Sequence, residues 1–272
     1  MSLKQISAVE DSAALADNIV ELFHAAKMPS LADSGLYLGI PHTSLLKLYE
    51  ALHKQYLEDE NRKFYNRMLY AGIFKERTEN TFMWDGDTYP ESEPGLVEQI
   101  LAIDFIRQGK NLIIVGPPGV GKTLLAVIAA CNAIREGLSV KYRTAHRIAT
   151  ELREARLGNS LAGYIKKFQS CDLLVLEDIT FSSLEPNTAQ AFFAIIDGRY
   201  ARKSTIVTSN GNVKDWVNSF PDKSMCSALL GRLYENALIM NMNGAKDMRI
   251  CKANPMFANS GVPLSGSGEG AL

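Results

Sequence analysis

One segment of the sequence combines glycines, a lysine and a threonine at the spacing that phosphate chemistry needs. Gly116, Gly121, Lys122 and Thr123 satisfy the pattern Gly-x-x-x-x-Gly-Lys-Thr. Glycines let successive backbone N–H groups point at phosphate oxygens, the lysine reaches the β- and γ-phosphates, and the threonine hydroxyl can ligate Mg²⁺. The sequence therefore predicts a loop that binds ATP with Mg²⁺. The expected ATP contacts are Gly116, Pro117, Pro118, Gly119, Val120, Gly121, Lys122, Thr123 and Leu124.

A second candidate for chemistry is an acidic pair, Glu177 and Asp178, directly after the apolar run Leu173–Leu176. ATP hydrolysis needs a carboxylate near Mg²⁺ and a group that orients the attacking water. We assign Glu177, together with Thr123, to the metal and Asp178 to the water. Adjacent side chains of a strand point to opposite faces, so the two acids need not share one role. The alternative is that two acids simply end a strand in solvent.

The elements that must position these residues alternate between short apolar runs and longer amphipathic ones. The predicted strands are Leu112–Val115, Ser139–Arg143, Leu173–Ile179, Thr205–Thr208 and Ala237–Met242. The clearest predicted helices are Lys122–Arg135, Ala145–Arg156 and Thr188–Arg202. Strands that alternate with helices predict an α/β fold with a parallel sheet covered on both faces. The phosphate loop then lies between a strand and a helix, which is its confirming context.

The chain of 272 residues divides into three zones. Residues 1–95 read as a helical, partner-binding domain and linker, with Ser44 as the expected N-cap of a helix and breaker-rich sequence over 84–95. Apolar residues of this helix recur at helical spacing: Leu45, Leu48, Tyr49, Leu52 and Tyr56. Residues 96–254 form the ATPase domain, and 255–272 read as a loose tail.

Several segments together resemble the IstB/DnaC family of AAA+ ATPases, which assist transposition or load replicative helicases. The resemblance covers roughly residues 60–252 and rests on Gly116–Thr123, Asp172–Asp178, Tyr200–Asn210 and Leu229–Leu233. It implies an AAA+ P-loop domain that hydrolyses ATP as a homo-oligomer on DNA. A GTPase fits worse, because the lysine in residues 212–215 is misplaced for guanine recognition. A small-molecule kinase also fits worse, because the cluster of arginines that would form its lid is not evident.

The resemblance implies catalytic roles for three further residues. Asn210 is similar to sensor 1, which contacts the γ-phosphate and the water; the alternative is an ordinary turn residue. Arg232 is similar to the arginine finger that reaches a neighbouring subunit's γ-phosphate; the alternative is an exposed helix arginine. Arg249 matches sensor 2 more loosely.

The order of the acidic pair departs from the family, in which Asp-Glu or Asp-Asp stands at this place. Glu177 approaches the metal with one extra methylene, and Asp178 holds the water with one fewer. Because displacements of about 1 Å can cost roughly a hundredfold in rate, slow hydrolysis with intact binding is one expectation.

Basic and aromatic residues indicate surfaces for partners. The family resemblance suggests contact with the phosphates of double- or single-stranded DNA through Lys141, Arg143, Arg147, Lys166 and Lys167. The alternative is a solvated helix face. Aromatic residues at 49, 56, 64 and 65 either pack in a core or dock a transposase or helicase.

Bulk composition limits the remaining possibilities. The net charge of −1 counts mildly against a large DNA footprint, and four scattered cysteines and four scattered histidines make a zinc site unexpected. No apolar run suits a membrane helix and no secretion signal is evident, so we expect a cytoplasmic protein.

The favoured interpretation is a homo-oligomeric AAA+ ATPase that assembles on DNA with ATP and stimulates a transposase. A replicative helicase loader, an ATP-gated adaptor with very slow hydrolysis, and a monomeric P-loop kinase or hydrolase are the alternatives.

Overall fold

The computed structural model describes residues 12–74, 95–179, 185–210, 217 and 220–245. The chain divides into two compact units, residues 1–67 and 68–272. This division falls earlier in the chain than the boundary near residue 95 that the sequence suggested, because residues 68–73 contact strand residues 141–143 of the second unit. The proposed tail and almost all of the proposed linker lie outside the described residues.

The first unit is helical, as predicted. It contains α2 (Ser12–Ala25), α3 (Pro29–Asp33) and most of α4 (His42–Ala71). Its core joins Leu15 and Ile19 of α2 to Leu45 and Tyr49 of α4. The predicted apolar repeat over residues 45–56 lies within one long helix, α4. Ser44 does not cap it, because α4 begins at His42 and the backbone N–H of Ser44 donates to the carbonyl of Pro41.

The second unit is built on a five-stranded sheet. Its strands are β1 (Leu112–Val115), β2 (Val140–Thr144), β3 (Leu173–Glu177), β4 (Ser204–Ser209) and β5 (Leu238–Asn241), in the order β2-β3-β4-β1-β5. Every neighbouring pair is parallel, so all carboxyl ends meet at one edge of the sheet. Each predicted strand is present within two residues of its predicted ends.

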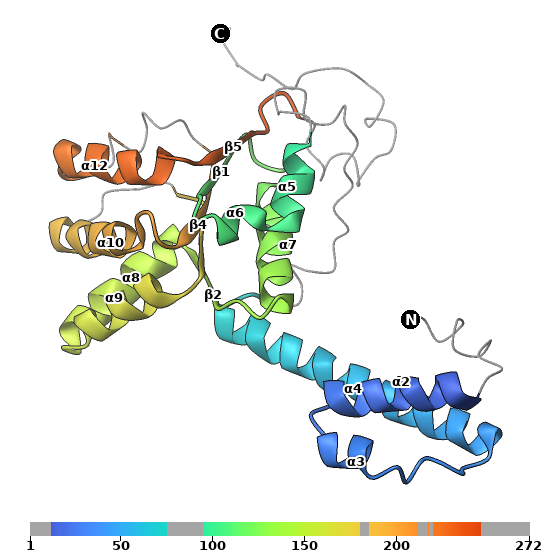
Figure 1. Cartoon of the computed structure of the whole chain (residues 1–272). Helices are drawn as coiled ribbons and strands as arrows, with labels where there is room; N and C mark the ends of the chain where they lie inside the picture. Colours follow the sequence, from blue (N-terminus) through green and yellow to red (C-terminus); the bar gives the residue numbers. More distant parts are fainter. Residues whose placement is uncertain (1–11, 75–94, 180–184, 211–216, 218–219, 246–272) are drawn as a thin grey trace, which may run out of the picture. The chain divides into compact units, whose positions relative to one another are not determined.

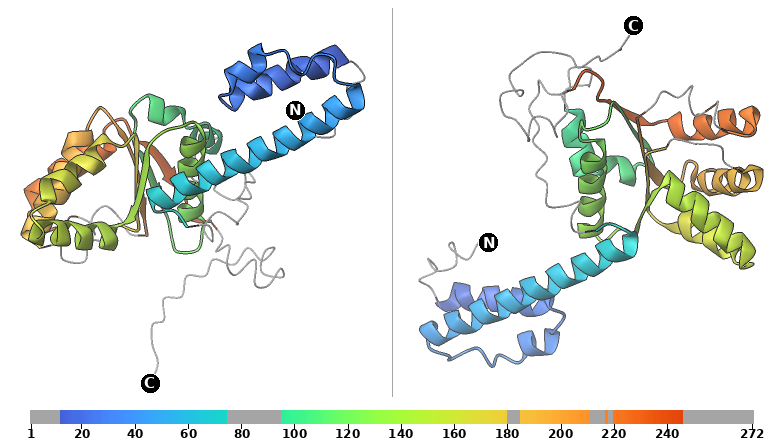
Figure 2. Two further views of the ribbon diagram at one scale, coloured as in Figure 1. Left: turned by 90° about the horizontal axis from the view of Figure 1, so that it is seen from below. Right: turned by 180° about the vertical axis from the view of Figure 1, so that it is seen from behind.

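Helices cover both faces of this sheet (Figures 1 and 2). One face carries α5 (Leu96–Ala102), α6 (Asp104–Arg107) and α7 (Lys122–Arg135). The other carries α8 (Ala145–Leu157), α9 (Leu161–Ser170), α10 (Pro186–Arg199) and α12 (Lys223–Tyr234). The predicted α/β class is therefore confirmed, and α7 has its predicted bounds.

Strand burial explains why the sheet forms where it does. Every residue of β3 and β4 is buried, as expected for parallel strands covered on both faces. Alternation places Leu174 and Leu176 of β3 in a core with α8, α9, α10 and α12. Glu177, two residues after Val175, consequently lies on the opposite face, where α7 packs.

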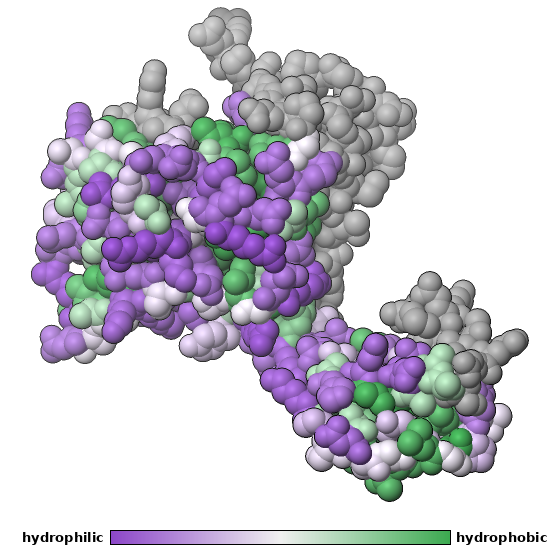
Figure 3. Space-filling model, in the orientation of Figure 1, coloured by the Kyte–Doolittle hydropathy of each residue, from purple (hydrophilic) through white to green (hydrophobic). Residues whose placement is uncertain are grey.

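Exposed apolar side chains gather on the first unit around α3, where Figure 3 shows hydrophobic surface. They are Met28, Leu31, Leu36 and Leu38. Tyr49 is buried and Tyr65 is exposed, so the aromatic residues singled out in this region divide between core and surface. Across the residues that the structure describes, no helix is both long and apolar enough to span a membrane.

Candidate functional site

The phosphate loop leaves the carboxyl end of β1 and enters α7. Gly121 is the residue before α7 and has φ +100°, a conformation that strains any residue with a Cβ. A Cβ on Gly116 would lie 2.8 Å from Cβ of Met242, so the loop also needs glycine for close packing against the segment after β5. Pro117 and Pro118 are exposed while Val120 is buried, which leaves the middle of the loop facing outward.

Lys122 is directed into this loop rather than away from it. Its side chain is nearly buried, and Nζ donates to the carbonyl oxygens of Gly116 and Pro117, each at 2.7 Å. The ammonium is thus held at the N-terminal end of α7, where the helix dipole also favours an anion. Loop backbone, helix end and lysine charge together suit a bound phosphate.

Thr123 and Glu177 are brought together from different elements. Thr123 Oγ1 donates to Oε1 of Glu177 at 2.6 Å, and the hydroxyl of Tyr142 on β2 donates to Oε2. Glu177 is only 9% exposed. A threonine hydroxyl and a carboxylate beside a phosphate loop are the oxygen donors that Mg²⁺ takes when it also binds nucleotide phosphates, so these residues fit that ion. In the described part of the chain, no group of three or more His, Cys, Asp or Glu side chains could hold a metal by itself.

Asp178 and Asn210 form a separate polar pair beside the loop. Nδ2 of Asn210, the residue after β4, donates to Oδ1 of Asp178 at 2.7 Å, and both side chains are exposed. Asp178 has φ +53°, and its backbone N–H donates to Oγ1 of Thr208. Aspartate tolerates this left-handed conformation better than most residues with a side chain. The two acids of the predicted pair therefore have different partners, as strand alternation indicated.

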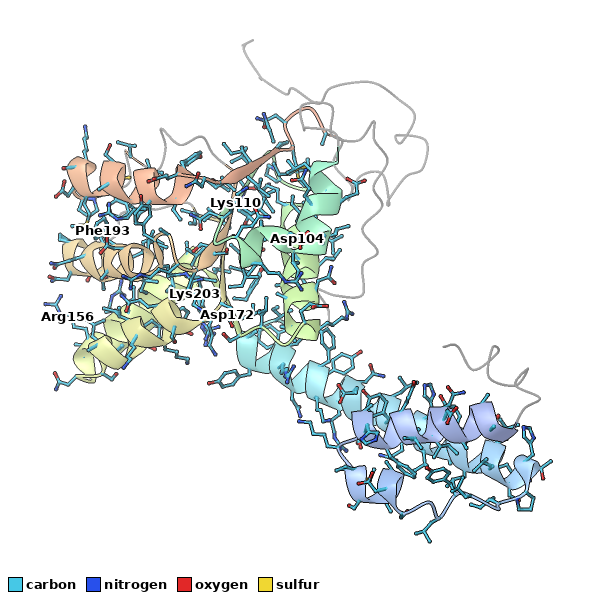
Figure 4. All side chains as sticks on the ribbon, viewed as in Figure 1. Asp104, Lys110, Arg156, Asp172, Phe193 and Lys203 are labelled. Atoms are coloured by element: carbon cyan, nitrogen blue, oxygen red, sulfur yellow. The ribbon has the colours of Figure 1, made fainter. Side chains whose placement is uncertain are left out.

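Arg232 lies at the other end of the sheet. The backbone carbonyls of Arg232 and Leu233 accept hydrogen bonds from Asn111, the residue before β1. The phosphate loop begins after β1, which at about 3.3 Å per residue is roughly 13 Å away. Nε of Arg232 donates to Asp197 at 2.6 Å, and the guanidinium lies over the ring of Phe193, which Figure 4 shows between α10 and α12. The structure therefore does not bring Arg232 to its own chain's phosphate loop.

Two of the five basic residues proposed for DNA, Lys141 and Arg143, are withdrawn from the solvent. Lys141 is 5% exposed, and its Nζ lies 3.6 Å from the ring centroid of Tyr70. Burial, followed by the charges of Lys167 and Arg143, lowers the pKa of Lys141. Arg143 donates to Glu151 at 2.9 Å and to the carbonyl of Ala71 at 3.1 Å. A continuous stripe through 141 and 143 is therefore not present on the surface. Arg147, Lys166 and Lys167 are exposed.

Glu151 of α8 is the centre of a second polar cluster. Burial opposes its ionisation, but hydrogen bonds from Tyr164, Arg143 and Arg147 outweigh burial and lower its pKa from 4.5 to about 2. Burial and, after it, the hydrogen bond with Glu151 raise the pKa of Tyr164. This cluster ties β2 to α8 and α9.

Sequence reasoning missed two residues that the site uses. Tyr142 was part of a predicted strand, and Thr208 ended another, but neither was given a role. Only the pairing of β2 with β3, and of β3 with β4, brings them to Glu177 and Asp178. Arg249, the proposed sensor 2, lies outside the described residues. Cys131, Cys171 and Cys226 are buried, and Cys251 lies outside the described residues.

Comparison with known proteins agrees with this geometry. The family model of IstB-like ATP binding proteins matches residues 41–253. A protein of insertion sequence IS232 from Bacillus thuringiensis subsp. berliner, whose name describes it as ATP-binding, is 30% identical over 177 residues, 65% of this chain and 70% of the relative. A similarly named protein of insertion sequence IS5376 from Geobacillus stearothermophilus is 28% identical and covers 72% of this chain and 78% of its own length.

Solved structures share the fold. A DnaA from Aquifex aeolicus with bound AMPPCP has a TM-score of 0.52 at 22% identity, over 70% of this chain and 58% of that one. A DnaI structure has a TM-score of 0.50 at 17% identity, over 62% of this chain and 94% of that one. The second unit accordingly shares the fold of these proteins.

Proposed function

Because the chain belongs to the family of IstB-like ATP binding proteins, we propose that it binds ATP with Mg²⁺ and serves as an ATP-dependent helper of a transposase. The relatives named above belong to insertion sequences and carry ATP-binding names, which supports both halves of the proposal.

The observation that carries the proposal is the contact of Thr123 with Glu177 beside the phosphate loop. The loop and Lys122 bind the triphosphate, and the two oxygen donors hold Mg²⁺ next to it. Bound Mg²⁺ neutralises charge on the β- and γ-phosphates. The residues of the loop fix the orientation of the phosphates.

Hydrolysis is the further step that we propose. Asp178 and Asn210 lie in contact at the carboxyl edge of the sheet, and both side chains are exposed. The carboxylate accepts a hydrogen bond from water, and the amide limits the rotation of that carboxylate. The left-handed backbone of Asp178 supports aspartate at this position, since a longer glutamate tolerates it less well.

The position of Arg232 supports a proposal of assembly. The backbone of Arg232 lies at the end of β1 that is roughly 13 Å from its own loop, which favours action on the γ-phosphate of a neighbouring subunit. Its side chain is 30% exposed, so it remains accessible to such a neighbour while Asp197 orients it. We therefore propose a homo-oligomer that assembles on DNA with ATP, in which the exposed Arg147, Lys166 and Lys167 contact DNA phosphates.

Size-exclusion chromatography with light scattering tests this function directly. Wild type, Arg232→Ala and the control Arg107→Ala are compared with and without ATP-Mg²⁺ and a short duplex. Arg107 is also an exposed arginine in ion pairs, with Asp104 and Glu136, and has no proposed role. We expect nucleotide-dependent assembly for wild type and Arg107→Ala, and loss of assembly or turnover for Arg232→Ala. A wild-type protein that stays monomeric and ignores DNA in every condition contradicts the proposal.

The second candidate is an ATP-gated adaptor that turns over very slowly, favoured by the order Glu177-Asp178. Shortening Glu177 to aspartate restores the usual metal ligand without altering the strained residue Asp178. A gain of tenfold or more in steady-state ATP turnover for Glu177→Asp supports the adaptor, whereas an unchanged or lower rate means that the native glutamate is suited to catalysis.

A further inference from the structure

Tyr142 stands on the edge strand of the sheet, yet its hydroxyl is in contact with the proposed magnesium carboxylate. The residue is 4% exposed. In the β2–β3 register, Tyr142 is opposite Val175 and Thr144 is opposite Glu177, so Tyr142 is a diagonal neighbour of Glu177 on the face covered by α7. The tyrosine therefore reaches Glu177 from the neighbouring strand, whereas Thr123 reaches it from α7.

The two oxygens of Glu177 have different neighbours. Oε1 accepts from Thr123, a hydroxyl that can rotate and present a lone pair to a cation. Oε2 accepts from Tyr142, whose hydroxyl is fixed by a ring that packs in the interior. A glutamate has one more rotatable bond than an aspartate, so a metal ligand of this type requires more restraint to hold one position.

We propose that Tyr142 is a positioning residue for magnesium: its buried hydroxyl holds Oε2 of Glu177 and thereby keeps Oε1 beside Thr123, where the ion binds. The inference rests on the proposed ATP function. It also gives a physical reason for glutamate at 177, because the longer side chain spans the distance between α7 and β2 and accepts a hydrogen bond from each.

The role predicts a specific defect. Removing the hydroxyl in Tyr142→Phe keeps the ring and its packing but releases Oε2. Loss of a hydrogen bond that orients a metal ligand typically weakens metal binding by about 10- to 100-fold. Binding of ATP alone depends on the loop and Lys122, and is expected to stay within about twofold of wild type.

The experiment measures the affinity of a fluorescent ATP analogue with Mg²⁺ and with EDTA, for the full-length protein. The variants are wild type, Tyr142→Phe, Glu177→Asp, the double variant and Tyr164→Phe. Tyr164 is a matched control, because its hydroxyl also donates to a glutamate, Glu151, outside the site. Thermal unfolding of each variant verifies folding.

The quantity compared is the ratio of the analogue's affinity with Mg²⁺ to its affinity with EDTA. We expect this ratio to be at least tenfold smaller in Tyr142→Phe than in wild type. In Tyr164→Phe we expect the ratio to equal that of wild type. In the Glu177→Asp background, Tyr142→Phe has no further effect, since the shorter carboxylate does not reach the phenol. An unchanged Mg²⁺ effect in Tyr142→Phe overturns the inference and leaves ATP binding standing. Wild type that does not bind the analogue in either condition removes both proposals.

Discussion

Two adjacent residues of β2, Tyr142 and Arg143, point to opposite faces of the sheet, and each donates to a glutamate. On the α7 face, Glu177 accepts from the hydroxyls of Tyr142 and Thr123. On the α8 face, Glu151 accepts from the guanidinium of Arg143 and from Tyr164. Each cluster thus contains a residue of β2, a glutamate carboxylate and a tyrosine hydroxyl of its own.

Their donors make the difference. Thr123 can reverse its hydrogen bond and become a ligand itself, so the Glu177 cluster can accept a cation without breaking the fold. In the Glu151 cluster, guanidinium groups already supply positive charge to the carboxylate. Burial raises the pKa of this carboxylate, but the hydrogen bonds from Tyr164 and from the two guanidinium groups lower it by more. A carboxylate with exchangeable neutral donors suits binding, whereas one between arginines suits structure.

Replacing each glutamate by glutamine gives the largest expected contrast. Glu177→Gln removes the charge of the proposed metal ligand, and we expect ATP turnover to fall by about a hundredfold or more with little change in the free energy of unfolding. Glu151→Gln is expected to retain turnover within about threefold. Steady-state ATPase assays on both variants check this, and equal losses of activity would remove the functional distinction between the clusters.

Stability is expected to show the opposite order. Glu151→Gln leaves Arg143, which is only 16% exposed, with a neutral partner, and we expect a loss of about 1–3 kcal/mol in unfolding free energy. Glu177→Gln keeps one acceptor oxygen and replaces the other with an amide NH₂, so a hydrogen bond from only one of the two hydroxyls is lost, and the variant is expected to cost less. Urea unfolding of the two variants measures the difference. A larger loss of unfolding free energy for Glu177→Gln would mean that the Glu177 cluster, rather than the Glu151 cluster, contributes more to stability.

The contrast also has a pH signature. The pKa of Glu151 lies near 2 in the folded protein, below its ordinary value of 4.5, so the unfolded chain binds more protons between these values. The stability that Glu151 contributes is complete above about pH 5 and declines as the pH falls toward 2. The stability gap between wild type and Glu151→Gln should therefore narrow from pH 6 to pH 3 in urea unfolding. A gap that stays constant over this range would show that the carboxylate charge is unimportant.

The sequence predicted the α7-face cluster better than the α8-face cluster for a physical reason. Gly116–Thr123 is a local motif, and its glycines act through backbone geometry, so spacing alone indicates the site and the bounds of β1 and α7. Glu177 follows an apolar strand and was recognisable for the same reason. Tyr142 was not, because only strand pairing brings it to Glu177, and an aromatic residue in a strand is ordinarily core.

The basic residues show where sequence reasoning reached its limit. Lys141 and Arg143 carry the charge that DNA contact needs, but sequence gives no sign of whether a charge faces solvent or a partner on the next element. Arg143 meets Glu151 eight residues later, and Lys141 meets Tyr70, which is far earlier in the chain. Helix α9 was not among the predicted helices, although Leu161, Tyr164, Ile165 and Phe168 recur at helical spacing and pack against the core.

Arg147→Ala has the smallest expected effect on stability. This variant distinguishes the ion pair of Arg147 with Glu151 from its proposed contact with a DNA phosphate. Arg147 donates to Glu151 at 2.7 Å but its side chain is 69% exposed, so the ion pair is screened by solvent and Arg147→Ala should leave the unfolding free energy nearly unchanged. If Arg147 contacts a DNA phosphate, the same variant reduces the salt dependence of DNA binding by about one unit in log–log slope. Fluorescence anisotropy with a labelled duplex at several salt concentrations measures that slope. A normal slope with normal stability would make Arg147 a solvated arginine and leave Lys166 and Lys167 as the remaining basic candidates on this face.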